Sequence, residues 1–425
     1  MAIRKTEAFM NVHSHAFAAA EESGPALIGL PTLAKLAFDG CDLAPVWNEL
    51  VTRAQSDPDD AAAFMDLSTI AHLQGRPDDR LALQAMALKI RRLYRLPPTV
   101  AAAKPLRLLA LMAPGDFMAN IPIEFMLDGS PVALDMLYLS EDEPLPALPA
   151  HDVALVAIAE SSGNQALLRQ LAKLARIWPQ PLLNAPEHIA RLTREGTWDV
   201  LKSAPGVMMP MNAPISRADL ARIAQGSLAV EGVLGGAGFP IIARPEDSHA
   251  GHGLEKLDDA AAVAAYLEKR PEQVFSIAPF IDYRSPDGLY RKYRIALIAG
   301  KPYACHMAVS THWMIHYLNA EMREREERRA EEARFFAEFD NDFAARHARA
   351  LAAINERFAL DYIPFDCGET ADGKLLVFEA GTNMIVHSMD PPDLFPYKPA
   401  QMRKVFGAFE AMLRITCGGE EAAVA

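Results

Sequence analysis

Hydrophobic positions follow a helical period near the start of the chain. From Pro45 to about Leu96, apolar residues recur every three or four positions, with breaks at Asp57-Pro58 and Gly75-Arg76-Pro77. This pattern predicts three helices. Residues 1 to about 40 mix polar residues, glycine and proline without a sustained period, so we expect a partly ordered lead-in there.

The three predicted helices resemble one tetratricopeptide-like helix pair. Asp66, Leu67, Gly75 and Ala87 lie near the positions that such a unit uses. The unit is single and degenerate, whereas a concave peptide groove needs several stacked repeats. We therefore expect residues 1–100 to form a helical region that acts as a docking or dimerisation cap.

From Leu106 the pattern changes to an alternation of strands and helices. Apolar runs of strand length at 106–112, 132–139 and 153–159 are separated by a short helix and followed by an amphipathic one. This βαβ pattern predicts a small parallel sheet flanked by helices over residues 104–186. Ligands of such sheets lie at the carboxyl ends of the strands, so the loops Met112–Asn120 and Glu160–Asn164 are candidate rim loops or simple connections.

Residues 187–257 are expected to form a helix at 187–204, a second helix capped by Ser216, and a strand at 239–243. Asp258-Asp259 then cap another helix. Apolar runs at 274–281, 290–299 and 303–309, joined by turns, predict an antiparallel meander.

Alternation along the strand at 290–299 places Lys292 and Arg294 on one face with Tyr290, while Tyr293 and Ile295 face the other way. Two cations therefore project together from a sheet, either toward a bound anion or as a solvated face. Residues 319–358 predict one or two long helices, with a charged first half exposed to solvent and an apolar stripe in the second half.

A hairpin is predicted over residues 362–380, centred on Asp372-Gly373. Its register places Asp366 opposite Glu379. Two adjacent carboxylates repel each other, unless a hard divalent cation such as Mg2+ joins them. Asn383 and His387 follow within reach, and the alternative is an exposed acidic pair on a solvated hairpin.

The stretch Phe239–Leu257 is typical of a strand that ends in a cation, Arg244, and continues into a glycine-rich loop. Gly251 and Gly253 allow backbone N–H groups to approach an anion closely. Ser248, with His249 and His252, adds hydrogen-bond donors. The loop therefore predicts a phosphate-binding segment, with an ordinary hairpin loop as the alternative.

Composition narrows the classes of function. The 425 residues are long enough for two or three domains, and their net charge of −13 argues against nonspecific nucleic-acid binding. No apolar run is long enough to span a membrane and no signal peptide is visible, so we expect a cytoplasmic protein. The four scattered cysteines indicate neither a disulfide framework nor a zinc site.

Taken together, the arginine-ended strand, the glycine loop, PFID, YRKYR and the D…E…N series resemble the ATP-grasp superfamily. The resemblance is to ligases of the RimK type and the glutathione-synthetase type, over roughly residues 106–415. It implies an α/β and α+β fold in which a parallel-sheet pre-ATP-grasp domain (104–186) precedes a two-subdomain ATP-grasp domain (187–420). It also implies that ATP and Mg2+ are required.

The resemblance assigns roles by position. It implies that Arg244 binds the α- and β-phosphates and that Ser248, Gly251 and Gly253 form the mobile loop over the phosphates. Adenine and ribose would be bound by Phe280, Ile281 and Asp282. Arg294, with its neighbour Lys292, would steady the transferred phosphoryl group, and the metal ligands would be Asp366, Glu379 and Asn383.

The sequence departs from the family's pattern at three positions. Glu379 is followed by Ala380-Gly381, so that the asparagine arrives only at 383. Gly196 and Arg244 stand where lysines are usual in the family, and an arginine keeps the charge but changes its shape. On the acceptor side, His306, His312 and His387 either line a substrate pocket, act as bases or pack as ordinary histidines.

The function implied is an ATP- and Mg2+-dependent ligase that joins a small-molecule or peptide carboxylate to an amine through an acyl phosphate. Phosphoryl transfer needs positioned cations and metal rather than a protein nucleophile. Two alternatives remain: an ATP-grasp kinase for a small molecule, and a nonenzymatic scaffold whose ATP site has decayed. A protein partner or a second copy of the chain would dock on the helical region, and neither nucleic acid nor membrane is expected.

Overall fold

The computed structural model describes residues 26–246, 248 and 251–418. Its N-terminal part is helical, with α2 (Leu30–Phe38), α3 (Ala44–Ser56), α4 (Ala61–Leu73) and α5 (Pro77–Ile90). The three helices predicted from Pro45 onward are confirmed. Two details were wrong: α2 lies in the expected irregular lead-in, and residues 93–96 form a strand, β1 (Leu93–Leu96), instead of helix.

Buried aspartates fix the helical region. Asp60 caps α4 by accepting a hydrogen bond from the Ala63 backbone N–H at 2.9 Å. Asp66, 1% exposed, accepts from the N–H groups of Ile28 and Gly29 at 2.8 and 3.0 Å and so ties the start of α2 to α4. Burial raises the pKa of Asp66 to about 6.

The first sheet has the strand order β1-β3-β2-β4-β5. Its strands β2 (Leu106–Met112), β3 (Val132–Tyr138), β4 (Val153–Val156) and β5 (Leu182–Leu183) are parallel, and β1 joins β3 antiparallel. The helices α6 (Ile123–Met126) and α7 (Gln165–Ala175) connect them. The predicted small parallel sheet is confirmed.

The second sheet has the order β7-β10-β8-β9, with β7 (Ala213–Ser216), β8 (Ile241–Pro245), β9 (Glu255–Leu257) and β10 (Val274–Pro279). The helices α10 (Arg217–Ala224), α11 (Val230–Val233) and α12 (Ala260–Lys269) belong to the same part. The predicted caps are confirmed, because the Ser216 and Asp259 side chains accept from Asp219 and Ala262 N–H groups at 3.0 and 2.8 Å.

The third sheet has the order β12-β11-β13-β14-β6, with β6 (Val207–Met208), β11 (Tyr290–Ile298), β12 (Lys301–Ser310), β13 (Tyr362–Glu369) and β14 (Leu375–Ala380). The predicted meander is therefore wrong in its first pairing. The strand β10 pairs with β7 and β8, and only β11 and β12 are neighbours. A local hydrophobic pattern does not reveal which sheet a strand joins.

Two helical predictions also need correction. The segment 187–204 is broken into α8 (Pro186–Ile189) and α9 (Arg194–Leu201), because Thr193 caps a new helix by accepting from the Gly196 N–H at 2.9 Å. Residues 319–358 hold η4 (Tyr317–Asn319) at their start and then α13 (Glu326–Glu338), α14 (Phe343–Arg346) and α15 (Ala348–Phe358), instead of one or two long helices.

The predicted pairing of Asp366 with Glu379 is confirmed. Nearer the turn, however, Glu369 pairs with Leu375 and Cys367 with Val377, which is a register one residue different. A bulge between Asp366 and Cys367 absorbs the difference. The bulge therefore places the two carboxylates opposite each other.

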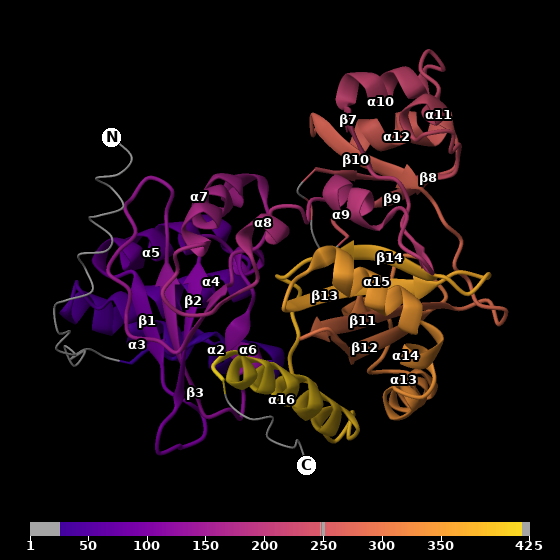
Figure 1. Cartoon of the computed structure of the whole chain (residues 1–425). Helices are drawn as coiled ribbons and strands as arrows, with labels where there is room; N and C mark the ends of the chain where they lie inside the picture. The colour runs from indigo at the N-terminus through magenta and orange to yellow at the C-terminus, as the bar shows by residue number, and fades with distance from the viewer. Residues whose placement is uncertain (1–25, 247, 249–250, 419–425) are drawn as a thin grey trace.

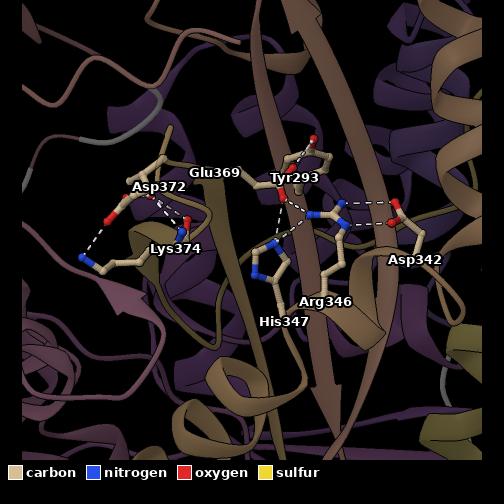
Figure 2. A network of polar contacts seen from close by, with 8 residues as sticks. Tyr293, Asp342, Arg346, His347, Glu369, Asp372 and Lys374 are labelled. Atoms are coloured by element: carbon tan, nitrogen blue, oxygen red, sulfur yellow. Dashed lines mark hydrogen bonds and ion pairs between the residues drawn. The ribbon is translucent and has the colours of Figure 1, made fainter. Parts of the chain in front are cut away.

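A polar network fastens α14 and α15 to this hairpin (Figure 2). Arg346 donates to both oxygens of Asp342, at 2.7 and 3.1 Å, and also pairs with Glu369. His347 lies 2.7 Å from the same Glu369 carboxylate, and the Tyr293 hydroxyl donates to it at 3.2 Å. These contacts lower the pKa of Glu369 to about 2, against the opposing effect of burial.

The C-terminal helix α16 (Lys398–Thr416) joins the two halves of the molecule (Figure 1). Met402, Val405 and Phe409 lie in one apolar cluster with residues of the first sheet and with Ala296 and Ile298 of β11. The second sheet has a smaller core of its own. In Figure 1 the second sheet lies above the third, and α9 lies between their labels.

The predicted mixed α/β fold class, with helices first, a small parallel sheet next and two further sheets last, is confirmed. No helix in the described part of the chain is long and apolar enough to cross a bilayer. All four cysteines are free.

Candidate functional site

A buried carboxylate held by two cations forms the centre of the candidate site. Arg294 donates from Nε and Nη2 to the two oxygens of Asp366 at 2.7 and 3.0 Å. The Lys292 Nζ lies 2.6 Å from the same carboxylate. Asp366 is 0% exposed, and the two cationic side chains are 16% and 17% exposed. The predicted common face of Lys292 and Arg294 is therefore confirmed.

The pKa values at this centre reflect strong mutual attraction. Burial by itself would raise the pKa of Asp366, but Arg294 and Lys292 outweigh it and lower that pKa far below its ordinary range. Burial opposes the charged form of Arg294 as well, yet Asp366 raises its pKa. Asp366 and Arg294 are therefore both ionised at neutral pH.

The second carboxylate lies between cations of two different sheets. Glu379 on β14 is exposed, and it interacts electrostatically with Arg294 of the third sheet and with Arg244 of the second. Arg244 and Arg294 therefore lie near the same carboxylate although they belong to different sheets. This arrangement is the one expected for a ligand bound between two sheets.

Arg244 is joined by a second arginine that the sequence did not reveal. The Arg244 Nε donates to the Ser248 hydroxyl at 2.9 Å, and its Nη2 donates to the Ser248 carbonyl. Arg194, at the start of α9, donates to the same carbonyl at 3.0 Å. Burial and the charge of Arg194 lower the pKa of Arg244 to about 10, while Glu379 opposes them.

Arg194 is two residues before Gly196, the position at which the sequence resemblance led us to expect a lysine. The only sequence signal for it was Thr193, a helix N-cap type just ahead of an arginine. The cap at Thr193 places Arg194 in the first turn of α9, and the tertiary structure brings it to Ser248.

The glycine loop is anchored at its end. Gly253 has a φ of +66°, and a Cβ there would lie 2.6 Å from Cδ of Pro245. Its carbonyl accepts from the Tyr266 hydroxyl at 2.9 Å. At Gly251, a Cβ would meet the Met314 sulfur at 3.4 Å, so the loop runs beside the segment after β12.

His252 in this loop is exposed. Asp247 and His249, which the sequence also placed in the loop, lie outside the described residues.

The residues expected near adenine follow β10. The Phe280 N–H donates to the Pro240 carbonyl at 3.0 Å, which connects the end of β10 to the start of β8. The Phe280 ring lies edge-on to Trp313, at a centroid distance of 5.5 Å. The Lys256 ammonium lies 4.7 Å from the Phe280 ring centroid. Aromatic rings and a cation therefore gather at this end of the second sheet.

Ile281 is partly buried among the aromatic residues between β10 and β11. Asp282 is exposed, and its carboxylate accepts from the Arg284 side chain at 2.6 Å. Hydrogen bonding by Arg284 lowers the pKa of Asp282.

The loop after β14 returns to the centre of the site. The Arg294 Nη1 donates to the Ile385 carbonyl at 2.8 Å. The Asn383 amide donates to the Met118 carbonyl at 2.8 Å, which attaches the loop to the first sheet's rim loop. A Cβ on Gly381 would lie 2.8 Å from the Asn383 oxygen, so the missing side chain at 381 leaves space for that amide.

The predicted acceptor histidines separate into two groups. His306 and His387 both interact electrostatically with Arg294, whereas His312 is exposed. Burial lowers the pKa of His306 well below its ordinary value and that of His387 to about 4. His316 also interacts with Arg294, and burial lowers its pKa as well. The structure therefore brings neutral imidazoles to the cationic centre.

The Nδ1 atom of His306 is buried and has no hydrogen-bond partner. Such orphaned atoms are uncommon in folded proteins. His387 differs, because its Nδ1 accepts from the Met389 N–H at 3.1 Å.

A buried network that the sequence did not reveal lies behind these histidines. The Lys398 ammonium, 4% exposed, is 2.7 Å from Asp390 and 3.4 Å from Glu332 and donates to the Tyr317 hydroxyl. Glu332 is 0% exposed and accepts from the Tyr397 hydroxyl at 2.8 Å. The network fixes the loop that carries His387 to α13 and α16.

The two carboxylates differ in how well they suit the expected magnesium site. Within the described residues, no three histidine, cysteine, aspartate or glutamate side chains gather as a metal-holding group. Both Asp366 oxygens are engaged by Arg294 and Lys292. Mg2+ needs only one or two protein carboxylates when a nucleotide supplies phosphate oxygens. Glu379 is exposed beside Arg244 and Arg294, so it suits binding of Mg2+ together with a nucleotide. Asp366 is the other carboxylate of the pair.

Comparison with known proteins gave matches to solved structures only. No protein-family profile matches the chain, and the search of curated proteins found no match. Among solved structures, the VanG D-Ala:D-Ser ligase from Enterococcus faecalis is 10% identical, covers 73% of this chain and all of its own, and has a TM-score of 0.42. A RimK domain protein of the ATP-grasp type from Sphaerobacter thermophilus is 16% identical, covers 72% of this chain and 99% of its own, and has a TM-score of 0.40.

Because the sequence identities and TM-scores are low, the functional proposal rests on the side chains of the cationic centre and not on these two structures. The tetratricopeptide-like character of the N-terminal helices stays a prediction.

Proposed function

We propose that the protein is an ATP-dependent ligase that joins a carboxylate to an amine, with ADP and phosphate as the other products. The observation that carries this proposal is the group of four cations, Arg194, Arg244, Lys292 and Arg294, around the paired carboxylates Asp366 and Glu379. These six groups leave a local excess of positive charge in a chain of net charge −13. A polyphosphate is the ligand that this excess favours.

Arg194 and Arg244, which lie beside the second sheet, are assigned to the phosphates nearest the nucleoside. Arg194 and Arg244 converge on the Ser248 carbonyl, so their guanidinium groups are held close together despite their like charge. An anion between them would relieve that repulsion. Ser248, Gly251 and Gly253 would then cover the phosphates with backbone N–H groups.

The base and sugar are assigned to the segment after β10. Phe280 and Ile281 present an apolar and aromatic surface beside Lys256 and Trp313, which suits adenine. Asp282 would accept from ribose hydroxyls once Arg284 yields one of its hydrogen bonds. Both assignments follow the sequence resemblance.

Mg2+ bound with the nucleotide would be held by Glu379 and Asp366, with Asn383 nearby, and would neutralise charge on the phosphates. On the protein side, Arg294 is fixed by Asp366 and by the Ile385 carbonyl, so it is preorganised to stabilise charge that develops on the transferred phosphoryl group. Lys292 adds a second cation at the same point.

We assign the binding of the acceptor amine to the region around His306 and His387. An amine must be unprotonated to attack, and cations favour that form because they repel an ammonium group. Arg294 and Lys398 both act on these two histidines. A neutral His306, whose buried Nδ1 lacks a partner, can accept a hydrogen bond from the entering amine.

The proposed reaction has two steps. A carboxylate oxygen of the acid attacks the γ-phosphorus of ATP, the bond to the β-phosphate oxygen breaks, and ADP leaves. The amine nitrogen then attacks the acyl carbon, the carbon–oxygen bond to phosphate breaks, and the nitrogen loses one proton. Arg294 and Lys292 are the chain's own groups that stabilise the charge in the first step.

The domain assignment belongs to the same proposal. The catalytic module would be residues 187–420, the pre-ATP-grasp domain 104–186, and the helical region 1–100 the surface for a protein partner or a second copy. A cytoplasmic location fits a reaction that consumes ATP.

The proposal is tested by following ADP release over a panel of carboxylates and amines, with and without Mg2+. ADP release that requires both an acid and an amine supports it, whereas AMP and pyrophosphate as products contradict it. A stable phosphorylated product without amide formation would favour a kinase. The absence of any thermal stabilisation by Mg·ATP would favour a scaffold.

Matched variants sharpen the test. Arg294→Lys keeps the charge and loses the bidentate contact with Asp366, while Arg346→Lys makes the same change at the exposed bidentate pair with Asp342. We expect the first variant to lose activity and the second to retain it. Equal activity of both would remove Arg294 from the reaction.

A further inference from the structure

A small polar cavity lies away from the cationic centre, where the helical region covers the first sheet. It has a volume of about 70 Å3. Its walls come from α4 and α5 on one side and from the ends of β2 and β3 with the following loop on the other. Among the described residues that line it, none belongs to the cationic centre.

This position has a physical reason. The rim loop Met112–Asn120 follows the carboxyl end of β2, the edge of a parallel sheet at which ligands usually bind. In an isolated α/β domain this edge would be open to solvent. Here α4 and α5 pack against it and narrow the space into a cavity.

A buried arginine with one unpartnered nitrogen lines the cavity. Arg80 on α5 is 7% exposed, and its Nη1 atom has no hydrogen-bond partner. Buried guanidinium groups are normally paired, because an unmet charged donor is costly in a protein interior. The bare Nη1 therefore points to an anionic group that the cavity receives.

Hydrogen bonds fasten α4 and the neighbouring loop to α5 at and near this arginine. The Ser68 hydroxyl donates to the Arg80 carbonyl at 3.0 Å and fastens α4 to α5 at that residue. One turn further along α5, the Gln84 side-chain amide donates to the Gly115 carbonyl at 3.0 Å and accepts from its N–H at 2.8 Å. A Cβ at Gly115 would lie 2.5 Å from the Ala119 Cβ, so this tight loop requires glycine.

The opposite side of the cavity is acidic and hydroxylic. Glu124 on α6 and Tyr138 on β3 both line it and interact with each other. Burial raises the pKa of Glu124 to about 7. Asp66 also lines the cavity, but its carboxylate is already used by the Ile28 and Gly29 N–H groups. Asp116 lines the cavity as well, and its Oδ1 accepts from the Met118 N–H at 2.9 Å. The groups that remain for a ligand are the Arg80 cation on one side and the Glu124 carboxyl with the Tyr138 hydroxyl on the other.

We propose that this cavity binds a small carboxylic acid that carries an amine or hydroxyl group, with its carboxylate on Arg80 and its donor group toward Glu124 and Tyr138. A volume of about 70 Å3 holds a molecule of a few heavy atoms. Inorganic phosphate could accept a hydrogen bond from Arg80, but it would also place negative charge near the Glu124 carboxyl and offer it no amine. This site is independent of the proposed ligase reaction, and its test needs no nucleotide.

Binding is measured by isothermal titration of the full chain with glycine, β-alanine, γ-aminobutyrate and lactate, which vary the spacing and the type of donor. Acetate lacks the donor and ethylamine lacks the carboxylate. We expect at least one amino or hydroxy acid to bind with 1:1 stoichiometry, about tenfold more tightly than acetate and ethylamine. Tighter binding of phosphate than of every acid would overturn the carboxylate assignment.

Variants locate the site. Arg80→Gln and Glu124→Gln should each weaken binding about tenfold or more, whereas Arg76→Gln, an exposed arginine four residues earlier, should leave it unchanged. If Arg80→Gln fails to fold in a circular dichroism melt, Arg80→Lys preserves the charge and should still weaken binding. No saturable heat from any acid at about 10 mM with the unaltered chain, or full binding by Arg80→Lys and Glu124→Gln, would refute the proposal.

Discussion

The sharpest prediction concerns the charge of Asp366. In Asp366→Asn, two cations that are 16% and 17% exposed lose the carboxylate between them. Removing one partner of a buried ion pair costs about 3–5 kcal/mol, because the remaining charge stays buried without compensation. The asparagine oxygen can still accept one hydrogen bond, so we expect about 3 kcal/mol, or roughly 3 °C in melting temperature for cooperative unfolding of the 425 residues.

The chain contains a matched control for this substitution. Asp342 accepts from Arg346 through both oxygens, at 2.7 and 3.1 Å (Figure 2). The Asp366–Arg294 pair has nearly the same geometry, at 2.7 and 3.0 Å. Its side chain is 55% exposed, against 0% for Asp366. We therefore expect Asp342→Asn to cost below about 1 kcal/mol.

Scanning calorimetry of both variants decides the matter, with and without Mg·ATP. Asp366→Asn should also lose the shift in melting temperature that Mg·ATP produces, whereas Asp342→Asn should keep it. If the two substitutions destabilise the protein equally, burial does not determine the strength of the pair and the reasoning fails. An unchanged nucleotide response in Asp366→Asn would remove this carboxylate from the site.

Three further predictions can be checked separately. Arg244→Ala should abolish ATP binding, and Arg194→Ala should weaken it about ten- to a hundredfold, since each removes a charged hydrogen-bond donor. A fluorescent-nucleotide titration measures both affinities, and values equal to that of the unaltered protein would contradict this prediction. Gly253→Ala should destabilise its loop by about 1–3 kcal/mol, because its φ of +66° and the Pro245 contact exclude a side chain, and faster proteolysis would report it. The pKa of Glu369 is lowered to about 2 from an ordinary 4.5, so this carboxylate contributes stability that is present above pH 4.5 and is lost as the pH falls toward 2. Glu369→Gln should therefore cost about 2 kcal/mol near pH 6, a value reduced because Arg346 is exposed, and nearly nothing near pH 2. Urea titrations at the two pH values measure this difference.

The sequence by itself determined the order of most elements and two features of the candidate site. Strand alternation depends on neighbouring residues only, so the common face of Lys292 and Arg294 could be predicted from the chain alone. The pairing of Asp366 with Glu379 was also predicted, although its register depends on a bulge that the sequence did not reveal. Caps at Ser216 and Asp259 were equally local.

Only the tertiary structure decided which distant groups meet. A hydrophobic run does not specify its sheet, so β10 was assigned to the wrong neighbour. Arg194 reaches Ser248 because a cap starts α9 at that point, 54 residues away along the chain. His306 and His387 gather at Arg294 while His312 stays exposed. The cavity around Arg80 exists because helices and sheet from separate segments close over one strand edge. Local periodicity specifies helices and strands, because it depends on neighbouring residues. The positions of binding sites depend on how those helices and strands pack together, which only the whole chain determines.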